Sequence, residues 1–208
     1  MPNHVRNRLT IPDEAKAKEA FDLMRSDKSE FDFEQICPIP PHVYKGSINN
    51  TIAKIFGATS HKIGDIELVT VYDTGDTWLP WCIEHWGTKW NAYSIERIDS
   101  ATIQFDTAWN GVPRIVLLLA DRIEIEEFTY EWADEDFCSN TGLVIGRKSP
   151  YGTLININQP KNLSREAFEI AAKLHPGYLR SDKNPEGYYW DEERDCLRSS
   201  LDDENADG

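Results

Sequence analysis

The chain has 208 residues, of which 40% are hydrophobic and 28% charged, as is usual for a globular protein. No apolar run approaches the roughly 20 residues that span a bilayer, and the first residues lack the apolar core of a signal peptide, so we expect a cytoplasmic protein. Lys and Arg number 22 against 36 Asp and Glu, and the net charge of −14 argues against direct nucleic-acid binding and favours a partner with a basic surface.

The first part of the chain predicts a strand, a helix and a second strand. Apolar and polar residues alternate in residues 3–11 and again in 31–36, which is typical of half-buried strands. Residues 10–26 have helical periodicity between them, and Thr10 with Asp13 resembles a capping box. The helix face expected in the core consists of Ala17, Ala20, Phe21 and Met24.

The middle of the chain, about residues 42–92, predicts an inserted helical region rich in tryptophan. A short helix is expected over residues 47–57, and at most one strand over 66–72. Residues 78–86 then predict a helix that Gly87 ends. The helix face that carries most of the large side chains should pack on the sheet, and we expect both Trp86 and Trp90 to be buried. The residues on that face are Trp78, Trp81, Cys82 and His85.

The second half of the chain predicts more strands and two helices. In order, we expect strands at 92–98, 101–109 and 125–132, with a helix over 110–123 capped by Asn110, then a hairpin over 142–158 and a helix over 164–174 capped by Ser164. The fold class is therefore α+β, a ferredoxin-like βαββαβ antiparallel sheet with helices on one face, a helical insertion and an extra hairpin and helix.

An acidic C-terminal tail, residues 182–208, follows one domain that spans residues 1–181. Ten acidic residues against three basic ones give the tail a charge of −7, and its lack of periodicity predicts a loose or merely docked segment. The tail would steer a basic partner at low salt. The residues expected to dock the partner are Asp191, Glu192, Glu193, Asp202, Asp203 and Glu204.

Two short motifs raise the question of catalysis. Residues 73–75 read Asp-Thr-Gly, as in aspartic proteases, but a single triplet would require a homodimer, and such residues are more typical of turns. Cys82 and His85 share a helical face and would need two further ligands, such as Cys37 and His42, to hold zinc. Without a recognisable catalytic set, we expect no enzyme activity, no metal and no cofactor.

Two alternatives nevertheless stay open. His4, Arg6 and Arg8 lie on the outward side of the first strand, which borders the open sheet face that single-strand RNA binders of similar topology use. A nucleic-acid or nucleotide-binding module would use Arg6 and Arg8 together with Lys89 and Asn91, which are polar and lie beside or next to tryptophans. A small nucleotide-directed enzyme would use His85 as its acid or base.

Two motifs, Trp-Gly-Thr-Lys-Trp-Asn at 86–91 and Phe-Asp-Thr-Ala-Trp at 105–109, resemble the phage- and plasmid-borne family named for the YubB ferredoxin-like domain. The resemblance covers roughly residues 1–146 and departs from the family over 121–132. It implies a ferredoxin-like core and a mobile-element accessory protein, and it brings no catalytic residue. Its structural motif consists of Trp86, Gly87, Trp90 and Trp109. The expected function is to bind a host protein, such as a defence or nucleic-acid-handling complex.

Overall fold

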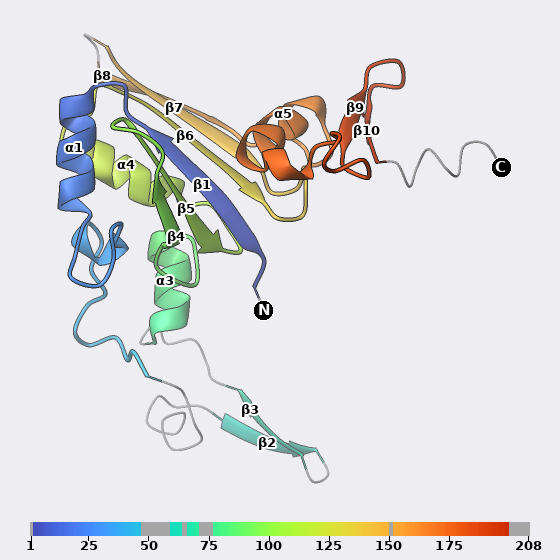
Figure 1. Ribbon diagram of the computed structural model, residues 1–208. Coiled ribbons are helices and arrows are strands. Elements are labelled where there is room, and N and C mark those ends of the chain that lie inside the picture. Colours follow the sequence, from blue (N-terminus) through green and yellow to red (C-terminus); the bar gives the residue numbers. More distant parts are fainter. Residues whose placement is uncertain (1, 47–58, 64–65, 71–76, 150–151, 200–208) are drawn as a thin grey trace.

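The computed structural model describes residues 2–46, 59–63, 66–70, 77–149 and 152–199 (Figure 1). Its main feature is a six-stranded antiparallel sheet in the order β4-β5-β1-β6-β7-β8. The first four strands of that order, with α1 and α4, form the split β-α-β arrangement that the sequence predicts. The elements are β1 (His4–Thr10), α1 (Glu14–Leu23), β4 (Tyr93–Arg97), β5 (Thr102–Ala108), α4 (Pro113–Arg122), β6 (Glu127–Asp134), β7 (Gly142–Ser149), β8 (Gly152–Asn158) and α5 (Arg165–Leu174).

The strand predicted at residues 31–36 is wrong. This segment contains a short 3₁₀ helix, η1 (Phe33–Gln35), which Asp32 caps by accepting a hydrogen bond from the Glu34 amide. Phe31 and Phe33 both point into the core, so two buried rings two residues apart imitate a strand pattern. The second strand of the fold is β4 instead, and the whole connection from α1 to β4 is the insertion.

The insertion contains one predicted helix and one hairpin. α3 (Trp78–Trp86) forms as expected, and Gly87 ends it in the left-handed region, with φ of 84°. β2 (Thr59–Ile63), which the sequence pattern did not reveal, pairs with β3 (Ile66–Thr70) in a separate two-stranded sheet. The helix predicted at 47–57 lies outside the described residues.

Two of the predicted helix caps are also wrong. Asp13 alone caps α1, by accepting hydrogen bonds from the amides of Ala15 and Lys16, while Thr10 is the last residue of β1. The N-cap of α4 is Val112, which makes no side-chain capping bond, so Asn110 does not cap that helix.

One face of the sheet carries the main hydrophobic core. α1, α3 and α4 contribute to it, and α1 and α4 lie on the same side of the strands (Figure 1). The ring of Phe31 stacks on Phe105 with centroids 4.8 Å apart, and Phe33 meets Trp86 edge to face. Trp86 is 3% exposed and donates a hydrogen bond from its indole nitrogen to the Cys37 carbonyl at 2.9 Å, so its predicted burial is confirmed.

α5 packs on the opposite face of the sheet, so the described helices lie on two faces (Figure 1). Ser164 caps α5 as predicted, and its hydroxyl accepts a hydrogen bond from the Ala167 amide. A second, smaller core cluster forms beneath the helix. Its buried residues are Ala133, Phe137, Cys138, Ala167, Ile170, Ala171 and Leu174.

The tail is docked through residue 199 rather than loose. After η2 (Pro176–Tyr178), strands β9 (Tyr189–Asp191) and β10 (Cys196–Arg198) form a hairpin beside α5 (Figure 1). The Tyr188 ring stacks on Phe137 with centroids 4.8 Å apart, and Trp190 packs on Phe168. The predicted boundary at residue 181 therefore separates two segments that pack against each other.

Candidate functional site

A polar pocket of about 490 Å³ opens on the face of the sheet where α5 lies. Strands β1, β4 and β5 form its floor, and the segments that follow β6 and α5 form its wall. This volume is within the range of pockets that hold small ligands or a partner's side chains. We call it the open-face pocket. Its lining residues are His4, Arg6, Tyr93, Ser94, Asp106, Glu135, His175 and Tyr178.

His4 and Tyr93 form a hydrogen-bond chain with a defined direction. His4 Nδ1 lies 2.7 Å from the Tyr93 hydroxyl, which itself lies 3.0 Å from the Thr107 carbonyl. A carbonyl only accepts, so the single tyrosine proton points to Thr107, and His4 Nδ1 donates to the hydroxyl. Nε2 of neutral His4 is then a free acceptor. Burial raises the pKa of Tyr93 to about 12, and the charges of Asp106 and Glu135 act in the same direction.

The charged residues of the pocket leave an excess of negative charge. Arg6 Nε lies 3.2 Å from Asp106 Oδ1, and Asp106 is only 9% exposed. Glu135 accepts a hydrogen bond from the His4 amide at 2.9 Å. One arginine faces two carboxylates, so these three side chains together attract a cation and repel a phosphate.

His175 closes the pocket on the side of α5. Its Nε2 lies 3.2 Å from the Ala133 carbonyl, and its ring stacks on Tyr178 with centroids 5.2 Å apart. Burial lowers the pKa of His175 and the nearby charge of Arg6 lowers it further, which together outweigh the opposing effect of the Ala133 carbonyl. His175 is therefore neutral at physiological pH and contributes a ring rather than a charge.

A group of three residues, which we call the Lys89 clamp, borders this pocket, and consists of the half-buried Lys89 with the exposed Trp90 and Trp109. Lys89 Nζ lies 4.9 Å from the ring centroid of Trp90 and 5.0 Å from that of Trp109. Both rings are 39% exposed, so the prediction that Trp90 is buried is wrong. The Trp90 ring meets the edge of Tyr93, which links the clamp to the pocket.

The backbone holds Trp109 in an unusual conformation, with φ of 74°. A positive φ is a clear outlier for so bulky a residue. Two hydrogen bonds hold it there, because its amide donates to the Asn3 carbonyl and its carbonyl accepts from the Asn140 side chain. The sequence motif at 105–109 thus ends in a ring that the surrounding structure fixes at the surface.

The four residues predicted to bind do not form one cluster. Arg6 lines the open-face pocket, and Lys89 belongs to the clamp beside it. Arg8 donates a hydrogen bond to the Gln104 side chain at 2.9 Å. Asn91 has a structural role, because its side chain donates to Asp32 at 2.6 Å and accepts from the Phe33 amide, which fixes η1 against the start of β4.

The acidic residues of the tail are partly used within the chain. Asp191 pairs with Arg194 at 2.9 Å, and Glu192 pairs with Arg165 on α5. These hydrogen bonds hold the pKa of each carboxyl below its ordinary value. Glu193 is exposed. The other three predicted docking residues, Asp202, Asp203 and Glu204, lie outside the described residues.

The remaining candidates that fall within the described residues give no second site. Cys82 is buried, which raises the pKa of its thiol to about 12, and His85 packs on the Trp81 ring at 4.4 Å. Within the described ranges, no three His, Cys, Asp or Glu side chains are grouped as a metal would require. No described helix is long and apolar enough to cross a membrane. The Asp-Thr-Gly triplet, residues 73–75, lies outside the description.

Comparison with known families supports the fold. Residues 85–175 match a family model described as the ferredoxin-like domain in Api92-like protein. The fold is ferredoxin-like. The matched segment runs from the end of α3 to the end of α5, and it includes Tyr93, Asp106, Glu135 and His175 of the open-face pocket. No curated protein and no solved structure matches the chain.

Most residues of the open-face pocket were missed from the sequence. Asp106, Glu135 and His175 come from β5 and from the segments after β6 and α5, and only the strand order and the packing of α5 bring them to His4 and Arg6 on β1. A partial signal was present, because the outward positions of β1 and β5 are all polar except Ala108. In the antiparallel pairing of these two strands, Asp106 lies opposite Arg6.

Proposed function

We propose that the protein is a non-enzymatic accessory protein of a phage or plasmid, as the resemblance to the YubB family implies, and that it binds a basic host protein. The observation that carries the proposal is the open-face pocket, in which two carboxylates and several rings surround one arginine that is already paired. The net charge of −14 supports the same kind of partner.

A lysine or arginine side chain of the partner fits this pocket chemically. Asp106 and Glu135 supply carboxylates for charge-assisted hydrogen bonds, and Tyr93 and Tyr178 supply rings over which a cation binds. Tyr and Trp are also the residues that most often dominate binding energy at protein interfaces. The Lys89 clamp shows, within this chain, a cation held between two exposed rings next to the pocket.

The two alternatives receive less support from the geometry. A nucleic-acid module would need several free cations on the open face, but Arg6 pairs with Asp106. That leaves Arg8, bonded to the neutral Gln104 side chain, as the arginine of β1 that forms no ion pair with a described residue. For a small nucleotide-directed enzyme, the favourable observation is the free Nε2 of His4, which could act as a general base. A panel of nucleotides incubated with the protein tests that alternative by turnover.

The test is affinity purification from nuclease-treated host lysate with two matched variants. Glu135→Gln removes one negative charge from the pocket, and Glu126→Gln removes one at the other end of β6, about 30 Å away. We expect one basic protein to be recovered with wild type and with Glu126→Gln, and about tenfold less with Glu135→Gln, because a charged hydrogen bond is lost.

Two outcomes would contradict the proposal. Equal recovery with both variants would show that the open-face pocket does not receive the partner. Recovery of the protein from untreated lysate but not from nuclease-treated lysate would favour the nucleic-acid alternative.

A further inference from the structure

Among the described strands, β8 forms one edge of the main sheet, and no described strand pairs with it on its outer side. It is the last strand of the sheet order, and the side chains from Thr153 to Asn158 are exposed on both faces. Its sequence, Gly-Thr-Leu-Ile-Asn-Ile-Asn, has no charged residue and no proline. Three large apolar side chains are exposed on it, Leu154 at 65%, Ile155 at 39% and Ile157 at 52%. Such a strand is a template for pairing with another strand.

The other edge of the same sheet is protected. In β4 the pairing register with β5 shifts between Tyr93 and Glu96, and Ser94 has φ of 49°. Glu96 and Arg97 place charges on the strand. Irregular backbone and charged side chains are the usual means of blocking an edge, so the lack of both at β8 points to a partner there.

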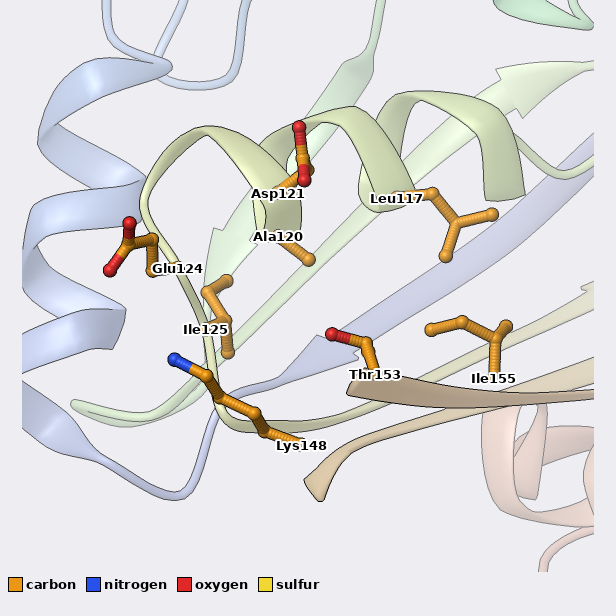
Figure 2. Close-up of a pocket in the computed structure, with 8 residues that line it drawn as sticks. All are labelled: Leu117, Ala120, Asp121, Glu124, Ile125, Lys148, Thr153 and Ile155. Carbon is orange, nitrogen blue, oxygen red and sulfur yellow. The ribbon is translucent and has the colours of Figure 1, made fainter. Parts of the chain in front are cut away.

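The apolar surface of β8 continues toward α4. A groove of about 360 Å³ runs between α4 and the β7–β8 hairpin, and Figure 2 shows Leu117 and Ile155 facing each other across it. Ala120 and Ile125 extend the apolar lining, while Glu124 and Lys148 lie toward one end. Ile155 therefore belongs both to the edge strand and to an apolar groove.

We propose that β8 pairs with β8 of a second copy of this chain, antiparallel, so that two six-stranded sheets join into one. A two-fold axis at Asn156 places that residue opposite itself in the second copy. In the same register, Ile155 lies opposite Ile157 of the second copy, and the two-fold repeats this pair. Pairs of β-branched residues are among the favourable cross-strand contacts. The dimer uses the edge of the sheet and leaves the open-face pocket free, so it does not depend on the proposed function.

Charge favours a second copy over a basic partner at this edge. The strand offers no carboxylate to a basic segment, whereas two uncharged strands meet without repulsion in spite of the net charge of −14. The charges next to the edge are already balanced, because Arg147 pairs with Glu127 at 2.8 Å and Lys148 lies 3.9 Å from Glu126. An interface in which the same residues meet is also the usual form of a two-fold dimer.

Sedimentation of the full chain over a range of concentrations tests the dimer. We expect wild type to be a dimer and Ile157→Lys to raise the dissociation constant about tenfold or more, since both copies of the isoleucine pair are lost. The double variant Ile155→Glu with Ile157→Lys should recover the dimer, because the new charges face each other across the two-fold. Leu118→Lys, which places the same charge at an exposed apolar residue on α4, 39% exposed against 52% for Ile157, should leave the dimer unchanged.

Cysteine cross-linking tests the register directly. Asn156→Cys places two thiols opposite each other, at a Cα separation of about 4.5–5.5 Å that a disulfide spans. Oxidation should link this variant into a covalent dimer. Asn158→Cys faces Leu154 of the second copy and should not be linked beyond the wild-type background. A monomer at the highest soluble concentration, or a dimer indifferent to Ile157→Lys, would overturn the proposal.

Discussion

The two faces of the main sheet are covered by different amounts of structure. On one face, α1, α3 and α4 bury a continuous core in which Phe105, Trp86 and Trp132 are at most 3% exposed. On the other face, α5 and the C-terminal hairpin cover part of the strands and bury a second, smaller cluster. The open-face pocket lies where this second cover ends, beside Arg6.

The strand β6 shows how the two faces differ in polarity. In β6, Tyr130 and Trp132 point to the main core, while Glu131 and Ala133 point to the side of α5. Glu131 binds the Lys173 ammonium at 2.5 and 2.7 Å, so even the contact with α5 is partly ionic. The well-covered face supplies stability, and the partly covered face leaves polar groups accessible to a ligand or partner.

The largest expected effect is on the well-covered face. Trp86→Ala should lower the free energy of unfolding by about 3–5 kcal/mol, as loss of a buried ring does. Trp90→Ala is the comparison in the same segment, and it should cost less, about 1–2 kcal/mol, because that partly exposed ring loses only its contacts with Tyr93 and Lys89. Urea denaturation measures both. If both variants lose the same free energy of unfolding, Trp86 is not buried more deeply than Trp90.

The next effect concerns the partly covered face. Truncation after Ser181 removes the ring contacts of Tyr188 with Phe137 and of Trp190 with Phe168. Each aromatic pair contributes roughly 0.5–1.5 kcal/mol, so we expect a loss of about 1–3 kcal/mol. A loose or merely docked tail, which the composition predicts, would instead add little to stability. Truncation after Ser199 keeps the hairpin and serves as the control. A thermal melt unchanged by the longer truncation would show that the second cluster is complete without it.

A smaller effect is expected at the end of α3. Gly87 has φ of 84°, and a Cβ added there would meet the Gly111 carbonyl at an ordinary 3.5 Å. The cost of Gly87→Ala is therefore conformational, about 1 kcal/mol, and not steric. Chemical denaturation gives this value. A loss as large as that of Trp86→Ala would instead indicate that α3 shifts on the core.

Much of the fold could be predicted from the sequence, because most elements bury one face. Val5 and Leu9 mark β1, and Ile115 and Leu119 mark α4, by simple periodicity. Phe31 and Phe33 imitate a strand, since two buried rings in a capped turn have the same spacing as in a strand. The exposure of Trp90 is not predictable from the sequence, because residue type alone does not show that a ring lies over Lys89 at the surface.

The smallest expected effect is the pH dependence that His175 contributes on the partly covered face. Burial lowers the pKa of His175 in the folded protein, whereas the unfolded chain takes up its proton near the ordinary value of about 6.5. Below that pH the unfolded state binds more protons, so the free energy of unfolding falls as pH drops through about 6.5 and levels off below the folded pKa. In His175→Gln the amide can still donate to the Ala133 carbonyl, and this part of the pH dependence should disappear. His42→Gln changes an exposed histidine and should keep it. Urea denaturation between about pH 5 and 8 gives the free energy of unfolding at each pH. If its dependence on pH is the same in both variants, His175 takes up its proton at the same pH in the folded and the unfolded protein, and α5 packs over it more loosely than described.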